Sequence, residues 1–274
     1  MSINLDQVLV KKFENEAILA FQEMGTDLRN TVRVRDAKGA QSVQFQVYGD
    51  VVMNERTSIH TPIPTIDPTL TPKVATVKRH AVSIFTDIFL NNEVGFDARQ
   101  DAVENINLAM KRRLDQIIID AMAGTTFTAD NQIATNASGT ADNLNVAMFA
   151  KGAEILGSEV PDSDRHILCH DKGFYHFIQE DDVKTIDSNL RKPLTDGNQP
   201  EYMGFKIHKL GDRKEGGLSE TAGVRKNYMW QKSAVGLALN MEPKIEVNYD
   251  PSYGAHRITG FLSAGGVVIQ DKGA

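Results

Sequence analysis

The sequence lacks the features that mark secreted, membrane-spanning and strongly basic proteins. Cys169 is the only cysteine, so no disulfide can form within the chain, and this thiol content suits a reducing compartment. No segment is apolar for long enough to cross a bilayer. The first residues carry charges where a signal peptide would have its apolar run. The net charge of −6 provides no overall basic surface for tight, sequence-specific binding to DNA.

Motifs for nucleotide binding and catalysis are also missing. The sequence contains no phosphate-binding GxxxxGK[ST] loop and no GxGxxG after a strand. It also lacks HExxH and GxSxG, which mark many metalloproteases and serine hydrolases. These absences disfavour an enzyme, and we expect no cofactor.

One segment, HILCHDKGFYH, still gathers residues that could carry chemistry: His166, Cys169, His170 and His176. A cysteine beside a histidine could be a nucleophile pair, and such clusters can bind zinc. On a strand, however, Cys169 and His170 point to opposite faces, which favours Cys169 as a core residue. Structural zinc sites usually need paired ligand spacings that one cysteine cannot supply. We therefore expect neither a catalytic nor a metal site.

The longest helical pattern runs over residues 97–123. Its apolar residues recur three and four positions apart, as on one face of a helix: Val103, Ile106, Met110, Leu114, Ile117, Ile118 and Ala121. Charged residues occupy the other face. At 1.5 Å per residue the helix would be roughly 40 Å long, which is long for a soluble domain.

An extended ribbon is predicted before this helix. Residues 31–49 alternate apolar and polar side chains in two runs, separated by a turn at DAKG. The segment HTPIPTIDPTLTP, within residues 50–72, is an irregular excursion because proline lacks the N–H of a sheet ladder. Residues 73–90 return as a strand rich in β-branched side chains. Because a two-stranded ribbon is marginal alone, we expect it to lie against another copy of the chain; the alternative is that it packs on its own domain as a β-meander.

The remaining residues alternate helices and strands before ending in strands. NLNVAMFAKGAEILGSE and DKGFYHFIQED predict helices, and DRHILCH and GFKIHKL predict strands. The last segments, PKIEVNYDP and HRITGFLSAGGVVIQD, alternate like strands. The fold class is therefore α+β.

This order of elements resembles the major capsid protein of tailed bacteriophages, the HK97 fold. Two sequence segments add to the resemblance: YMGFKIHKL at 202–210 and QKSAVGLALN at 231–240. The second segment is most similar to that of short-tailed, T7-like or P22-like phages. The resemblance implies the following parts: an N-terminal arm at 1–30; the extended ribbon, or E-loop, with flanking peripheral-domain strands at 31–90; the spine helix at 91–139; an axial domain at 140–250; and C-terminal peripheral strands at 251–274.

The resemblance also implies a structural function and a set of contact residues. The chain would self-assemble into pentamers and hexamers of an icosahedral head that encloses double-stranded DNA. The E-loop of one subunit would lie over the spine helix of the next. Its buried face would comprise Val43, Phe45, Val47, Ile63 and Ile66. On the spine helix, Arg112 and Asp115 are candidate partners for charges of the ribbon.

The expected partners follow from the same resemblance. They are other copies of the chain, a separate scaffolding protein, a portal protein and non-specifically packaged DNA, with no membrane. The protein would be assembled in the bacterial cytoplasm and reside in the virion. Two alternatives remain: an encapsulin-type nanocompartment shell with the same fold, and a cysteine-dependent hydrolase using Cys169 with His170 or His176.

Overall fold

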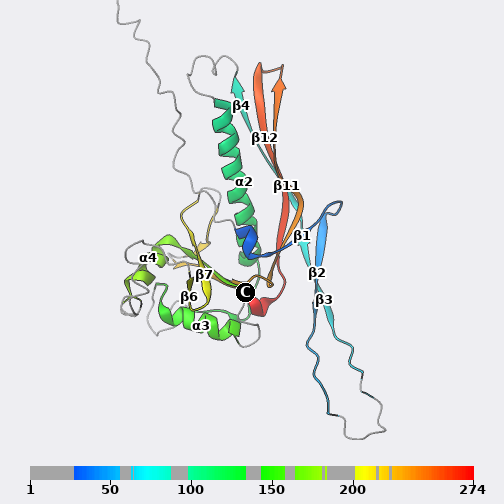
Figure 1. Ribbon diagram of the computed structural model, residues 1–274, viewed down its shortest axis with the longest axis vertical. Helices are drawn as coiled ribbons and strands as arrows, with labels where there is room; N and C mark the ends of the chain where they lie inside the picture. Colours follow the sequence, from blue (N-terminus) through cyan, green and yellow to red (C-terminus); the bar gives the residue numbers. More distant parts are fainter. Residues whose placement is uncertain are drawn as a thin grey trace, which may run out of the picture.

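The chain folds into two sheets that lie on opposite sides of one long helix, with a ribbon projecting from the body (Figure 1). The computed structural model describes residues 28–55, 63, 65–87, 98–133, 143–157, 164–180, 183, 201–213, 216–221 and 224–274. The expected N-terminal arm, apart from residues 28–30, and the tip of the proline-rich excursion lie outside these residues.

The larger sheet is built around a long hairpin of β11 (Val235–Asp250) and β12 (Ala255–Val268). β1 (Arg33–Asp36) pairs with β11 in parallel, and β4 (Lys78–Asp87) pairs with β12 in antiparallel fashion. The strand order β1-β11-β12-β4 leaves β4 at an edge. Two register shifts interrupt β11, between Leu239 and Met241 and between Met241 and Lys244.

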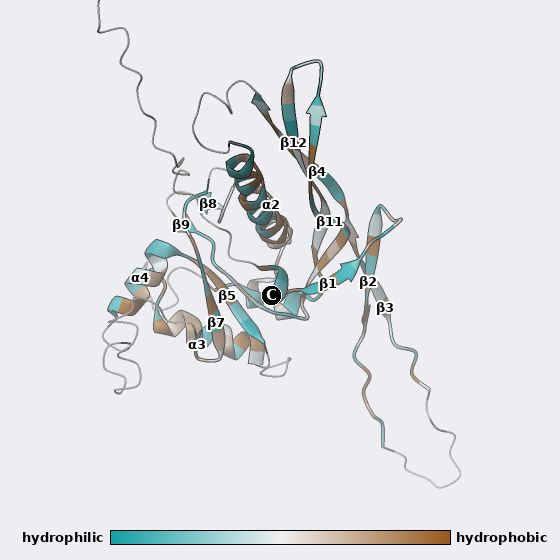
Figure 2. Cartoon of the chain, turned by 45° about the horizontal axis from the view of Figure 1, so that its top comes forward, coloured by the Kyte–Doolittle hydropathy of each residue, from teal (hydrophilic) through white to brown (hydrophobic). Residues whose placement is uncertain are grey.

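Helix α2 (Ala98–Ala123) lies along this sheet and changes its environment halfway. Its N-terminal half buries every fourth residue, as Ala102, Ile106 and Met110 show, because only one side of the helix is covered. From Leu114 to Ile119 every residue is buried, since the second sheet covers the other side. Figure 2 shows the hydrophobic residues of α2 on the side that faces β11 and β12.

The smaller sheet has the order β10-β5-β7-β6. It comprises β10 (Tyr228–Gln231), β5 (Arg165–His170), β7 (Phe205–Leu210) and β6 (Glu201–Tyr202). Helices α3 (Val146–Gly157) and α4 (Asp171–Gln179) cover the face that carries Ile167 and Cys169. Leu168 faces the opposite way, into the cluster around α2. All six residues of β5 are therefore buried. Shorter elements are β8 (Glu220–Thr221), β9 (Val224–Arg225), η2 (Leu28–Thr31), η3 (Ala129–Asn131) and η5 (Asp271–Gly273).

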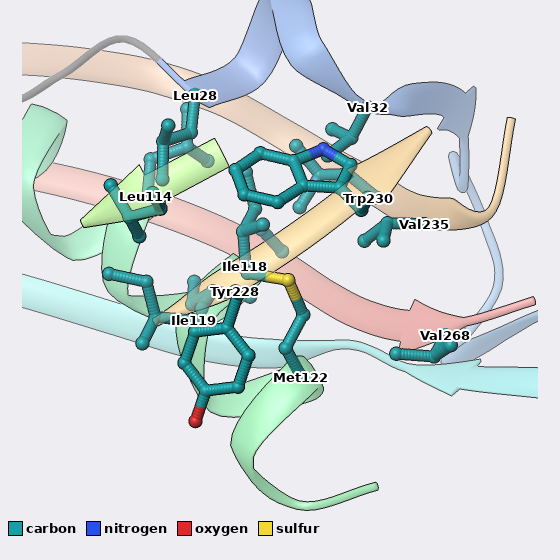
Figure 3. Packing of buried hydrophobic residues seen from close by; sticks show 14 of the residues in the cluster. Leu28, Val32, Leu114, Ile118, Ile119, Met122, Tyr228, Trp230, Val235 and Val268 are labelled. Carbon is teal, nitrogen blue, oxygen red and sulfur yellow. The ribbon is translucent and has the colours of Figure 1, made fainter. Parts of the chain in front are cut away.

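Trp230 is the largest side chain in the shared core (Figure 3). It lies among Leu28 and Val32, which precede the ribbon, and Leu114 and Ile118 of α2. Its indole N–H donates to the Thr31 carbonyl at 3.0 Å, which satisfies the one polar atom of the ring. The core thus joins the start of the described chain, the helix and both sheets.

A polar junction lies between α2 and the smaller sheet. Asp115 accepts hydrogen bonds from the Leu28 backbone N–H at 3.0 Å and from the Arg213 guanidinium at 3.4 Å. Both charged side chains are almost fully buried. Close by, His166 Nδ1 and His208 Nε2 are 3.2 Å apart, and both rings pack against Trp230.

The ribbon consists of β2 (Ser42–Tyr48) and β3 (Leu70–Thr76), paired from Ser42–Thr76 to Tyr48–Leu70. Its root packs on the larger sheet, on the face away from α2. Phe45 and Ala75 are buried there against Ala238 and Ile269. A side chain at Gly265 would collide with the Thr76 carbonyl, so glycine is what lets the ribbon cross the sheet this closely.

The α+β fold class is confirmed, and the helix predicted over 97–123 is observed over Ala98–Ala123. Two expectations are wrong. The runs on either side of the DAKG turn do not form a hairpin, because β1 pairs with β11 whereas β2 pairs with β3. The boundary expected at residue 250 is also misplaced, because β11 belongs to the larger sheet; the smaller sheet ends with β10 at Gln231.

We predict that Gly260→Val destabilises the subunit by about 1–3 kcal/mol, the usual cost of overpacking a core. A Cβ at Gly260 would lie 2.5 Å from Ile106 Cγ2, between β12 and α2. Chemical unfolding followed by circular dichroism measures the change. Gly173→Ala is the control, because its Cβ would meet Leu144 at an ordinary 3.6 Å. Unchanged stability of Gly260→Val would show that α2 does not need this close approach.

We predict that the subunit loses stability in acid through its histidine junction. Burial, and then His208, lower the pKa of His166 from 6.5 to about 4; burial also lowers the pKa of His208, which Asp115 partly opposes. Because both pKa values lie below those of the unfolded chain, stability falls as pH drops below about 6.5, and the part of the loss due to His166 levels off below about 4. The loss due to His166 is on the order of 3 kcal/mol.

Unfolding measured across this pH range tests the expectation. His166→Gln should flatten the pH dependence, whereas His176→Gln, at an exposed position, should leave it unchanged. Parallel pH profiles for the parent and His166→Gln would contradict the assignment to this junction.

Candidate functional site

The residues singled out as possible catalysts do not form a reactive site. Cys169 is completely buried, and burial, followed by Asp171, raises the pKa of its thiol to about 12. Its Sγ faces the His208 carbonyl at 3.7 Å. His170 caps α4 instead, because its Nδ1 accepts from the Lys172 backbone N–H. A buried, protonated thiol without a base is a core residue.

No group of three or more acidic, histidine or cysteine side chains that could hold a metal occurs among the described residues. No helix in the described part of the chain is long and apolar enough to span a bilayer. The surfaces of the described chain are the other candidates for function.

The ribbon carries the most conspicuous of these surfaces. We call its described outer part, residues 48–55, 63 and 65–71, the distal ribbon. Apolar side chains there are open to solvent, with Met53 96% and Ile63 74% exposed. The other exposed apolar residues of the distal ribbon are Tyr48, Val51, Val52, Ile66 and Leu70. Isolated exposed apolar residues are normal, but several on one projecting segment make that segment a candidate interaction surface.

The expected contact residues of the ribbon divide into two groups. Ile63 and Ile66 lie on the distal ribbon and are exposed. Phe45 is only 1% exposed and lies in the core of its own chain, so it cannot contact a neighbour. Val43 and Val47 are partly buried against the same cluster. The face expected to be buried against a neighbour is thus covered, at Val43, Phe45 and Val47, by the chain's own larger sheet.

The expected contact residues of α2 also divide. Asp115 is 2% exposed and held by Arg213 and the Leu28 N–H; it stabilises the subunit and is not available to a neighbour. Arg112 is partly exposed. The helical pattern put Asp115 on the charged face, but that face turns inward where the smaller sheet covers it.

Sequence reasoning missed Val51, Val52 and Met53. Their signal was present, because three consecutive apolar residues precede the proline-rich segment and cannot be explained by strand alternation. Sequence reasoning also missed the outer part of the larger sheet, where β4 is an edge strand.

Two depressions border β4. One, of about 500 Å³, lies between β4 and α2 and is lined by Arg79, His80, Ala81, Val82, Ala109, Met110, Arg113, Gly260 and Leu262. The other, of about 600 Å³, lies on the opposite face of the sheet and includes Ser83 and Arg257. Near it, Phe85 contacts Tyr253, with ring centroids 5.2 Å apart, and Arg257 lies over the Phe85 ring. The outer half of the sheet is therefore accessible on both faces and along its edge.

Comparison with known proteins agrees with this architecture. The family model described as phage capsid protein matches residues 5–274. Among curated proteins, none matches the chain in sequence.

Solved structures share the fold at low identity. The capsid structure of the cyanophage P-SCSP1u is 17% identical, has a TM-score of 0.74, and is matched over 100% of this chain and 93% of that chain. The capsid of cyanophage Pam1 is 11% identical, has a TM-score of 0.71, and is matched over 98% of this chain and 94% of that chain. A structure described as Mycobacterium phage Che8 is 12% identical, has a TM-score of 0.67, and is matched over 97% of this chain and 95% of that chain. The HK97-like fold expected from the order of elements is thereby confirmed.

The family match spans almost the entire chain, and the described fold is that of the capsid structures above. The chain belongs to the phage capsid protein family and is a structural, self-associating major capsid protein of the virion rather than an enzyme.

Proposed function

We propose that the protein forms the pentamers and hexamers of an icosahedral head, and that the distal ribbon of each subunit lies on the outer larger sheet and α2 of the next. One observation carries this proposal: the described residues of the distal ribbon include several large apolar side chains, Ile63 and Ile66 among them, that are exposed in the isolated subunit. Burying such side chains stabilises a contact by about 1.5–3 kcal/mol each before the costs of association.

The root of the ribbon supports this role. Phe45 and Ala75 fix the root in the core of the subunit, so the distal part is presented in a defined direction. Pre-ordering the segment reduces the entropy lost on binding. Repetition around a closed ring then makes a modest contact sufficient for assembly.

Further partners belong to the same proposal. A separate scaffolding protein would guide the curvature of the shell, and a portal protein would occupy one vertex. Assembly would take place in the bacterial cytoplasm. Packaged double-stranded DNA would contact the shell non-specifically, since a net charge of −6 favours sliding over tight binding.

The alternatives have less support. A nanocompartment shell shares the fold, but the family match is to phage capsid protein. A cysteine-dependent hydrolase would need a reactive thiol, whereas Cys169 is buried with its pKa raised to about 12.

We predict that Ile63→Asp combined with Ile66→Asp leaves a folded subunit that does not form particles. These side chains are 74% and 45% exposed, so the subunit tolerates the charges, whereas a contact that buries them does not. The chain is expressed with and without a candidate scaffolding partner and imaged by electron microscopy, with circular dichroism as the measure of folding.

The conservative variant Ile63→Val with Ile66→Leu is the control and should assemble, because it keeps the apolar surface. Normal particles from the aspartate variant would rule out the distal ribbon as the contact. Failure of the parent chain to form particles under any condition would count against the proposed assembly as a whole.

A further inference from the structure

The groove between β4 and α2 lies on the face of the larger sheet that packs against the helix, where the two elements run side by side (Figure 1). Its floor is formed by Gly260 and Leu262 of β12, and Met110 of α2 contributes apolar surface. Val82 faces the groove, because a side chain at Gly260 would meet both Met110 and Val82. The base of the groove is therefore apolar, and the side chains at its rim decide what it can bind.

Two short basic segments that are far apart in the sequence meet at this rim. β4 begins with KRH at 78–80, and α2 contains KRR at 111–113. His80 and Arg113 line the groove from its two walls. Lys78 lies on the same face of β4 as His80, because alternate residues of a strand share a face. No acidic residue is among the described residues that line the groove. A chain with a net charge of −6 thus has a local excess of positive charge here.

The positive charges of the rim are not balanced within the described part of the subunit. The pKa of His80 is lowered by burial and then by the positive charges of Arg113 and Lys78, so the three side chains are close enough to repel one another. Neither Lys78 nor Arg113 forms an ion pair with a described carboxylate. By contrast, the buried Arg213 is paired with Asp115. The rim therefore lacks a counter-charge of its own.

Two nitrogen atoms indicate where an anion would bind. His80 Nε2 and Arg113 Nε are shielded from solvent, and neither has a hydrogen-bond partner among the described residues. Leaving a buried donor unsatisfied is unfavourable, and more so when the donor is charged. An oxyanion placed between the two side chains would accept from both and would offset the clustered positive charge.

The chemistry of the groove favours a phosphate over a carboxylate. A guanidinium group matches the geometry of phosphate oxygens, and a phosphate offers more acceptor atoms to donors that approach from two walls. Basic residues also continue beyond His80 and Arg113 in both segments, which suits a ligand that repeats its negative charge, as a nucleic acid backbone does. Gly260 and Leu262 at the floor offer no polar side chain that could read a base, so binding would not depend on nucleotide sequence.

We propose that the groove between β4 and α2 is a phosphate-binding site, which holds a phosphodiester of the packaged double-stranded DNA between His80 and Arg113, with Lys78 beside it. This inference rests on the proposed function and assigns the contact with DNA to one defined site on each subunit. A single site of this kind is weak, but it is repeated on every subunit of the shell. The DNA is then held collectively while each contact can exchange.

Binding of a short, fluorescein-labelled DNA duplex of mixed sequence to the full chain tests the site. Lys78→Gln with Arg113→Gln should weaken binding by about tenfold or more and should reduce the slope of log K against log salt concentration by about 2. Lys78→Arg with Arg113→Lys keeps both charges and should retain the slope. Lys244→Gln with Arg257→Gln removes the same charge from the opposite face of the sheet and should change neither quantity. Fluorescence anisotropy measures binding, and circular dichroism measures folding.

Protection from a thiol reagent tests the location without changing a basic residue. Val82→Cys places a thiol in the groove, and the same duplex should slow its reaction with a maleimide several-fold. Asn248→Cys, on the opposite face of the sheet, is the control and should react at the same rate with and without DNA. The buried Cys169 contributes no background in the folded protein.

The outcomes separate this inference from the proposed function. Unchanged DNA binding by Lys78→Gln with Arg113→Gln, or equal protection of the thiols at positions 82 and 248, would overturn the phosphate site and leave the proposed assembly standing. A poly-glutamate peptide that binds through the groove where the duplex does not would assign it to an acidic protein segment and overturn the inference too, as would binding of inorganic phosphate alone. DNA binding that depends on the groove, in a chain that never forms particles, would support the site and count against the proposed assembly only.

Discussion

The buried carboxylate of Asp115 holds together the parts of the subunit that are far apart in sequence. It lies near the middle of α2 and binds the Leu28 N–H and the Arg213 guanidinium. A buried charge is tolerated only when its partners remain in place, and removing one partner from such a pair costs several kcal/mol. The start of the described chain, the helix and the segment after β7 are therefore constrained together.

Helix α2, which carries this carboxylate, is packed differently in its two halves. Its N-terminal half is covered by one sheet and buries one stripe of side chains. Its C-terminal half is covered by both sheets and is buried on all sides from Leu114 to Ile119. The subunit gains a single core from two sheets that do not hydrogen-bond to each other.

Local pattern in the sequence was enough to predict the elements. The three-and-four spacing of apolar residues predicted α2 with nearly correct first and last residues. The alternation of apolar and polar residues predicted the strands β2 and β12. Cys169 was predicted as a core residue because neighbouring strand residues face opposite ways, and it lies in the cluster beneath α3 and α4. Periodicity is a property of nearby residues, so the sequence displays it directly.

Pairing partners over long distances could not be predicted in the same way. Phe45 was correctly expected to be buried, but alternation does not say whether the cover comes from the same chain or from another. Asp115 was assigned to an exposed face because the sequence does not show that a second sheet covers the helix there. The groove of His80 and Arg113 combines residues of β4 and α2 with the floor of β12. Only the folded arrangement brings them together.

The two register shifts in β11, around Met241, have a mechanical consequence. A bulge leaves a strand locally unpaired and bends it, so the hairpin is softest against bending at this point. Below the shifts, β11 is clamped by β1 and the ribbon root; above them, it extends with β12 and β4 alone. In the proposed shell of pentamers and hexamers, identical chains would occupy rings of different curvature. A compliant point in the longest strand lets the angle change there without breaking the ladder on either side.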